Sequence, residues 1–190
     1  MSKNKLLLTI SIAAILQGCV AAAVVGVVGG ATVAADKRTV GQQIDDQTIE
    51  FNAYSALNKH EGIKEHTNLQ VTSLNGSVLI VGQAPNAFLK ELAVKTIAEL
   101  NGVQQIHNQI RISNNTSITT STNDVWLTSK VKTALFGSDT LEATNIKVVT
   151  ENAEVFLMGL VSTAEANEAV EIARNVSGVN RVFKAFEYVD

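Results

Sequence analysis

Histidine is the side chain best suited to acid–base catalysis or metal binding at neutral pH, and the chain has three. His60 and His66 flank a charged segment, and His107 stands alone further along. Neither His60 nor His66 has metal-ligand spacing with a cysteine or with His107. The sequence also has no phosphate-binding glycine loop and no nucleophile elbow. We therefore expect no enzyme, no metal site and no bound cofactor, and we interpret the segment around His60 and His66 as a solvated loop.

The single cysteine, Cys19, has the clearest chemistry in the chain. It follows Lys3, Lys5 and an almost wholly apolar stretch over 6–16. This order of charge, apolar stretch and small residue is typical of a secretory signal peptide, here 1–18. The apolar stretch is shorter than the roughly 20 residues that cross a bilayer. The residues Leu-Gln-Gly before Cys19 resemble a bacterial lipobox, although Gln17 replaces the usual small residue.

The lipobox resemblance implies that Cys19 receives diacylglycerol on its thiol and an acyl chain on its new amino group. Val20 stands where an aspartate retains such proteins in the inner membrane. The resemblance therefore implies an outer-membrane anchor, with the folded part in the periplasm. Residues 19–43 are expected to form a flexible tether, apolar and glycine-rich over 20–35 and then polar. The alternative is a buried cysteine in a transmembrane anchor.

Charge argues against nucleic acid as a partner. Without Lys3 and Lys5, the 15 basic residues become 13, against 18 acidic residues, so the mature chain has a net charge of −5. Nucleic-acid-binding domains are usually basic. An acidic chain of this length is expected to fold as one medium domain or two small ones.

An internal repeat favours two domains. It aligns four pairs of segments at a nearly constant offset. The pairs are 48–57 with 126–135, 69–71 with 146–148, 77–82 with 154–159, and 100–103 with 176–179. We expect a first domain over 44–113, a second over 124–190, and between them a linker over 114–123 that is polar and uncharged.

Each copy reads as helix, strand, strand, helix, strand. In the first copy, apolar residues recur at helical spacing over 46–59 and 86–100, and alternate over 68–73 and 77–82. Asn75-Gly76 predicts a tight hairpin turn, with Glu151-Asn152 as its counterpart. Ser162 or Thr163 is expected to cap the second helix of the second copy. Because a crossover helix returns the chain in parallel, the fold class is α+β with a three-stranded mixed sheet packed against two helices.

This ordered pattern resembles the BON domain, a small αββαβ module regarded as a binder of phospholipid membranes. Two tandem copies behind a lipobox resemble the dual-BON outer-membrane lipoproteins, and the resemblance covers the whole chain. The segments QGCVAAAVVG and VVTENAEVFLMGLV are especially similar. The resemblance implies contact with anionic phospholipids (phosphatidylglycerol and cardiolipin), a role in outer-membrane integrity, enrichment at the division septum and contact with the β-barrel assembly machinery.

The first helix of the second copy is the predicted lipid-binding element. With 100° per residue, Leu127, Val131 and Leu135 share the buried face. An outer tryptophan beside lysines suits a bilayer interface. The predicted lipid-binding residues are Trp126, Ser129, Lys130, Lys132, Thr133 and Phe136. The second copy carries 6 basic and 10 acidic residues over 114–190, so binding must be local to this helix. Alternatively, Trp126 packs between the domains.

The equivalent helix of the first copy carries Asp45, Asp46 and Glu50, an unfavourable surface for anionic lipid. Its aromatic residues Phe51 and Tyr54 lie off the buried stripe and are predicted to contact a partner protein or the other domain. This leaves a rival function open, in which the paired domains form a periplasmic protein-interaction scaffold and lipid contact is incidental.

Overall fold

The computed structural model describes residues 38–113 and 118–189. The predicted signal peptide, Cys19 and most of the tether lie outside these residues. Among the described residues, no helix combines the length and the apolar character needed to cross a membrane.

The described residues form two αββαβ units with the same topology. The first contains α2 (Val40–Leu57), α3 (Glu61–His66), β1 (Asn68–Leu74), β2 (Ser77–Ala84), α4 (Ala87–Ala98) and β3 (Gln105–Ile112). The second contains α5 (Ile118–Phe136), the 3-10 turn η1 (Ala143–Asn145), β4 (Ile146–Glu151), β5 (Glu154–Val161), α6 (Thr163–Arg174) and β6 (Arg181–Tyr188). The first hairpin of each sheet is antiparallel, and the third strand is parallel to the central one. The predicted α+β class and mixed sheets are therefore confirmed.

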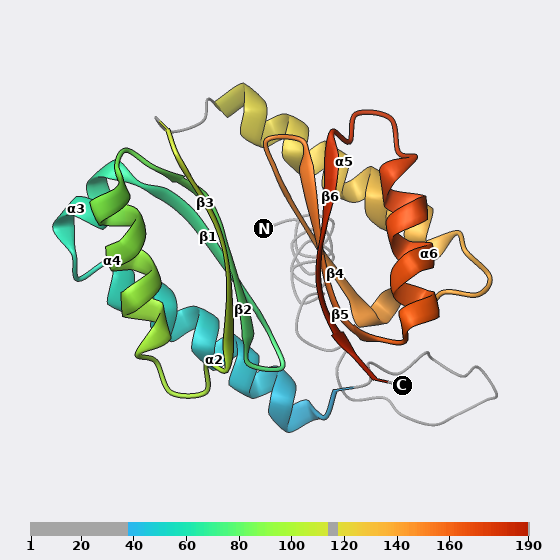
Figure 1. Ribbon diagram of the computed structural model, residues 1–190, viewed down its shortest axis with the longest axis horizontal. Helices are drawn as coiled ribbons and strands as arrows, with labels where there is room; N and C mark the ends of the chain where they lie inside the picture. Colours follow the sequence, from blue (N-terminus) through green and yellow to red (C-terminus); the bar gives the residue numbers. More distant parts are fainter. Residues whose placement is uncertain (1–37, 114–117, 190) are drawn as a thin grey trace, which may run out of the picture. The chain divides into compact units, whose positions relative to one another are not determined.

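Two helices cover one face of each sheet (Figure 1). In the first unit α2 buries Ile49, Ala53 and Leu57, which are spaced by four residues and so lie on one side of the helix. In the second unit α5 buries Leu127, Val131 and Leu135 in the same way. The predicted buried stripes are thus the packed ones, and they fix which side of each helix remains outside.

The ends of several elements differ from the prediction. Helix α2 begins at Val40, before residue 44, because Thr39 and Gln42 form a capping box. Helix α5 begins at Ile118, inside the segment 114–123 expected to be a linker. His66 ends a short helix, α3, and does not lie in a loop. Ser162, one of the two proposed caps, caps α6 with a capping box.

Both hairpins turn on two residues with positive φ. Asn75 and Gly76 have φ of 52° and 75°, as predicted for an Asn-Gly turn. In the second hairpin the turn residues are Asn152 and Ala153, with φ of 52° and 58°. The predicted pair Glu151-Asn152 is wrong by one residue, since Glu151 still pairs with Glu154 as the last rung of the ladder.

The sheet faces opposite the helices share a third apolar cluster. It takes Leu74, Leu79 and Val81 from the first sheet and Val149, Phe156, Met158 and Ala185 from the second. Phe156 also stacks on Phe183, with ring centroids 4.8 Å apart. Each sheet is therefore covered on one face by its own helices and on the other by the sheet of the other domain.

Candidate functional site

Trp126 lies on the outer side of α5, and 59% of it is exposed. It is absent from the cluster between the sheets, so the alternative in which it packs between the domains is wrong. Lys130 follows one helical turn later, and its Nζ lies 4.2 Å from the centroid of the indole ring. The same Nζ donates a hydrogen bond of 2.6 Å to the carbonyl oxygen of Ser177. The ammonium group is therefore held between an aromatic face and a loop carbonyl.

A shallow hollow of about 460 Å³ lies beside this pair. Its lining residues come from one side of α5 and from the loop after α6: Trp126, Ser129, Lys130, Thr133, Ala134, Val176 and Ser177. Four of the six predicted lipid-binding residues are thus brought together. Val176 and Ser177 were missed because they are remote in sequence, although both lie in the repeated segment 176–179.

The other two predicted residues, Lys132 and Phe136, do not line this hollow. They line a smaller one, of about 130 Å³, with residues of η1 and β4. Lys132 follows Lys130 by two residues, which places it about 200° further round the helix. Phe136 is 61% exposed and Val125 is 70% exposed. The exposure of Val125 was not predicted from the sequence. Helix α5 therefore presents two surfaces, the hollow at Trp126 and a stripe with Val125, Lys132 and Phe136.

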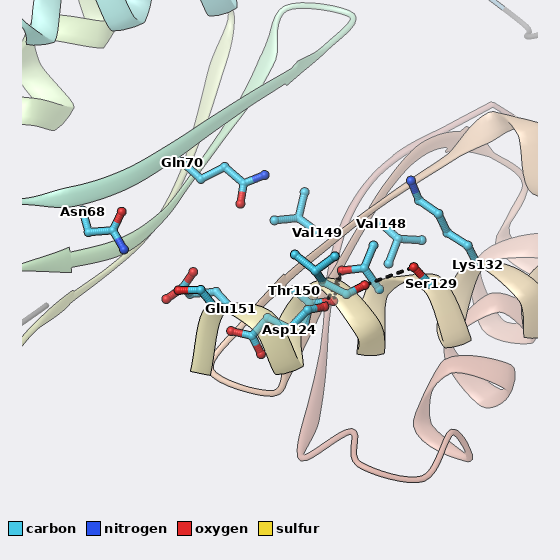
Figure 2. A pocket seen from close by; sticks show the side chains of 12 residues that line it. Asn68, Gln70, Asp124, Ser129, Lys132, Val148, Val149, Thr150 and Glu151 are labelled. Carbon is cyan, nitrogen blue, oxygen red and sulfur yellow. Dashed lines mark hydrogen bonds between the residues drawn. The ribbon is translucent and has the colours of Figure 1, made fainter. Parts of the chain in front are cut away.

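A polar groove runs between α5 and the edge of β4 (Figure 2). Its volume is about 470 Å³. One wall is the side of α5 that carries Ser129 and Lys132, and Asn68 and Gln70 of β1 face it from the first domain. Sequence analysis gave no sign of this groove, because its walls come from both domains.

The sequence suggested that Asp46 belongs to an acidic surface of α2. In the structure Asp46 is buried. Its carboxylate accepts hydrogen bonds from the backbone N–H groups of Asn75 (2.8 Å) and Gly76 (3.0 Å), from the Ser73 hydroxyl (2.7 Å) and from Arg38 (2.7 Å). Burial alone would raise the pKa of Asp46, but these hydrogen bonds together hold the pKa below its usual value. Asp46 therefore fastens α2 to the first hairpin turn.

Asp124 repeats this arrangement in the second domain. Its carboxylate accepts hydrogen bonds of 2.8 Å from the backbone N–H groups of Asn152 and Ala153. It is 5% exposed, and it occupies the same position of the repeat as Asp46. Two acidic residues in matching helices could suggest a catalytic pair. Each carboxylate instead accepts hydrogen bonds from the backbone of the hairpin turn in its own domain.

Phe51 and Tyr54 lie outside the cluster between the sheets. Phe51 is 73% exposed, and the Tyr54 hydroxyl accepts a 3.0 Å hydrogen bond from the N–H of Val71 in its own domain. Contact of these two residues with the other domain stays a prediction. Their contact with a partner protein stays a prediction. From α2, Glu50 reaches the second domain through a 3.3 Å ion pair with Lys147.

The described residues contain no group of three or more side chains of the metal-binding types that could hold an ion. His60 lies 3.3 Å from the Thr96 hydroxyl, and His107 lies 3.1 Å from that of Ser77. Burial lowers the pKa of His107, which favours its neutral form. These contacts are structural, and they bring no carboxylate or thiol to a histidine.

Comparison with known proteins identifies the class of fold. A family model described as the BON domain matches residues 45–114 and 123–190, one match for each αββαβ unit. The BON domain is non-catalytic, and the chain is accordingly not an enzyme.

Individual relatives narrow the assignment. The outer membrane lipoprotein DolP of Haemophilus influenzae is 41% identical over 187 residues, which is 98% of this chain and 97% of that protein. The 21 kDa hemolysin of Actinobacillus pleuropneumoniae is 40% identical, and the match covers 81% of this chain and 79% of the hemolysin. The osmotically-inducible protein Y of Escherichia coli is 29% identical, and the match covers 80% of this chain and 77% of that protein. The chain belongs to the DolP family of outer-membrane lipoproteins with two BON domains.

Proposed function

We propose that this lipoprotein binds anionic phospholipids, phosphatidylglycerol and cardiolipin, through α5 of the second domain. The observation that carries the proposal is the Trp126–Lys130 pair at the rim of the hollow. Lysine has three hydrogen-bond donors and one is used by Ser177, so two remain for phosphate oxygens. Tryptophan favours the level of the headgroups, where its ring is apolar and its N–H is wet.

The lipid anchor is part of this proposal. Residues 114–190 carry a net charge of −4, so long-range attraction to an anionic surface is absent. We propose that Cys19 bears diacylglycerol and an acyl chain, which hold the folded part in the periplasm against the outer membrane. Attachment raises the local concentration of bilayer around Trp126, as linking two sites does. Weak local binding is then sufficient.

Trp126 is the only tryptophan of the chain, so its fluorescence reports on this site alone. The lipidated protein is reconstituted in phosphatidylcholine vesicles, with or without phosphatidylglycerol and cardiolipin, and lipids brominated near the headgroup serve as quenchers. We expect strong quenching only with the anionic lipids. Lys130→Ala should weaken it several-fold, whereas Lys95→Ala, an exposed lysine of α4, should leave it unchanged. Equal quenching in both kinds of vesicle, or none in either, would contradict the proposal.

At the level of the cell, we propose that lipid binding supports outer-membrane integrity, with enrichment at the division septum and contact with the β-barrel assembly machinery. The family relationship supports this part of the proposal, and no geometry of the chain bears on it. A Trp126→Glu strain should lose septal enrichment while keeping normal protein levels. Phe88→Glu, which changes an exposed aromatic residue of α4, is the matched control.

One observation favours the second candidate, a protein-interaction scaffold. Val40, Ile44 and Phe51 are exposed by 73%, 59% and 73% and lie on one side of α2 at helical spacing. Photo-crosslinkers at residues 51 and 126 in whole cells separate the two functions. The scaffold predicts a dominant protein adduct from residue 51 and no lipid adduct from residue 126.

A further inference from the structure

The outer edge of β1 is closed by side chains of its own helix. In an antiparallel hairpin every second residue of an edge strand points its N–H and C=O away from the partner strand. In β1 two of these are Val71 and Ser73. The Tyr54 hydroxyl accepts from the N–H of Val71 (3.0 Å), and Glu50 accepts from the N–H of Ser73 (2.8 Å). Lys147 donates to the Ser73 carbonyl at 2.7 Å.

The matching edge of β4 lacks these caps. The pair Glu151–Glu154 flanks the two-residue turn as Leu74–Ser77 does, so Val148 and Thr150 hold the outward positions. Within the described part of the chain, neither outward N–H has a side-chain acceptor. In the repeat, Lys132 replaces Tyr54 and Thr128 replaces Glu50. An ammonium group cannot accept a hydrogen bond. The Thr128 hydroxyl contacts the Asp124 carbonyl oxygen at 2.9 Å and the Thr150 hydroxyl at 2.8 Å, and it accepts from neither outward N–H.

The open edge forms the floor of the polar groove. Val148, Val149, Thr150 and Glu151 line it along their length, with α5 on one side and β1 on the other (Figure 2). Lys132 stands beside the Val148 part of the groove, and Glu151 lies at the far end. The groove thus offers unpaired backbone groups between polar walls, with a cation towards one end and a carboxyl group at the other.

We propose that this groove binds an extended segment of another polypeptide, which adds to β4 as an extra strand. Unpaired strand edges recruit peptides through main-chain hydrogen bonds, and flanking side chains select the sequence. The segment that fits is polar, with an acidic side chain towards Lys132 and a basic one near Glu151. The proposal does not rest on phospholipid binding, because its contacts are the backbone groups of β4.

The charges favour this occupant over two others. The apolar segment 20–35 of the same chain has no charged residue to match Lys132 or Glu151. A second copy would have to approach with a folded sheet, whereas walls on both sides of the edge fit a single extended strand. Both alternatives predict distinct results in the experiment that follows.

Hydrogen exchange of the full-length lipoprotein in detergent micelles, read by NMR, tests the proposal. The probe is the blocked heptapeptide Lys-Val-Thr-Val-Thr-Val-Asp, compared with the same peptide N-methylated at every central amide. We expect the probe to slow exchange of the Val148 and Thr150 amides at least tenfold and the methylated peptide to have no effect. The Val71 and Ser73 amides, already capped, should not respond.

Two variants copy the closed edge of β1 onto β4. Thr128→Glu and Lys132→Tyr should each slow exchange of an edge amide and reduce the effect of the peptide several-fold. Tyr54→Phe should accelerate exchange at Val71 and serves as the reverse control. The proposal is overturned if saturating peptide leaves the β4 amides unchanged or if the methylated peptide protects equally. Protection of the β4 amides without peptide at every protein concentration would identify segment 20–35 as the occupant. Protection that grows with protein concentration would identify a second copy of the chain. Either result overturns the proposal.

Discussion

Replacing Asp46 with alanine removes the acceptor that ties α2 to the first hairpin turn. Four donors lose their partner, and the Ser73 hydroxyl and the Gly76 N–H belong to buried residues that water does not easily reach. A buried donor left without an acceptor costs about 1–3 kcal/mol. Asn75 and Arg38 are partly exposed and can recover a hydrogen bond from water. We therefore expect Asp46→Ala to lower the free energy of unfolding by about 3–5 kcal/mol.

Asp124→Ala should cost less, about 1–3 kcal/mol, because its two donors belong to residues that are partly exposed. Urea unfolding followed by circular dichroism measures both variants. Asp45→Ala is the control, since Asp45 is an exposed neighbour on the same helix and its loss should change the free energy by less than about 0.5 kcal/mol. If Asp46→Ala were no more destabilising than Asp45→Ala, the reasoning would be refuted.

The pH dependence gives an independent check on Asp46. Its pKa in the folded protein lies below the ordinary value of 3.8, so the unfolded chain binds a proton more readily. The stability that Asp46 contributes is therefore present above about pH 4 and is lost as the pH falls through the folded pKa. Below pH 4 the wild type should lose stability more steeply than Asp46→Ala, and parallel curves would contradict this account.

Two further substitutions test the hairpins. Ala153→Gly should raise the free energy of unfolding by about 0.5–1 kcal/mol, because Ala153 adopts a φ of 58° that glycine tolerates without strain. Gly76→Ala should lower the free energy of unfolding by about 1–2 kcal/mol, since a Cβ at this position would lie 2.7 Å from the Gly102 carbonyl oxygen. Burial raises the pKa of Glu151, and the nearby Asp124 adds to this effect. A hydrogen bond from Gln83 lowers the pKa, but it does not cancel the rise. The folded state then binds the proton more readily, and stability falls as the pH rises from the ordinary value of 4.5 to the folded one. Glu151→Gln should remove that fall and increase stability at pH 7, as urea titrations at pH 5 and pH 7 would show.

The repeat and its periodicity predicted the fold well, because apolar spacing and an Asn-Gly pair act locally. The buried stripe of α2 and the turn at Asn75-Gly76 were predicted at the correct residues. The functions of Asp46 and Asp124 were not, since their partners lie about thirty residues away and a buried acid looks like a surface acid in a sequence. The start of α5 was missed because a run of Ser and Thr has low helix propensity and gives no apolar period.

Part of the candidate site was also predictable. Rotation along α5 placed Trp126, Ser129, Lys130 and Thr133 on the outside, and they share one hollow. The separation of Lys132 from that hollow and the contribution of Val176 and Ser177 depend on how α6 and its loop pack beside α5. The groove at β4 required knowledge of both sheets, because its open floor is visible only by comparison with the capped edge of β1.

The apolar cluster between the sheets also sets a constraint on biogenesis. A lipoprotein is exported with its N-terminus first, so the first domain leaves the export channel before the second. During that interval the sheet face that carries Leu79 and Val81 has no covering layer. An uncovered apolar sheet face is prone to aggregate or to attract chaperones. The shared cluster therefore makes the nascent first domain dependent on the rate at which the rest of its own chain is delivered.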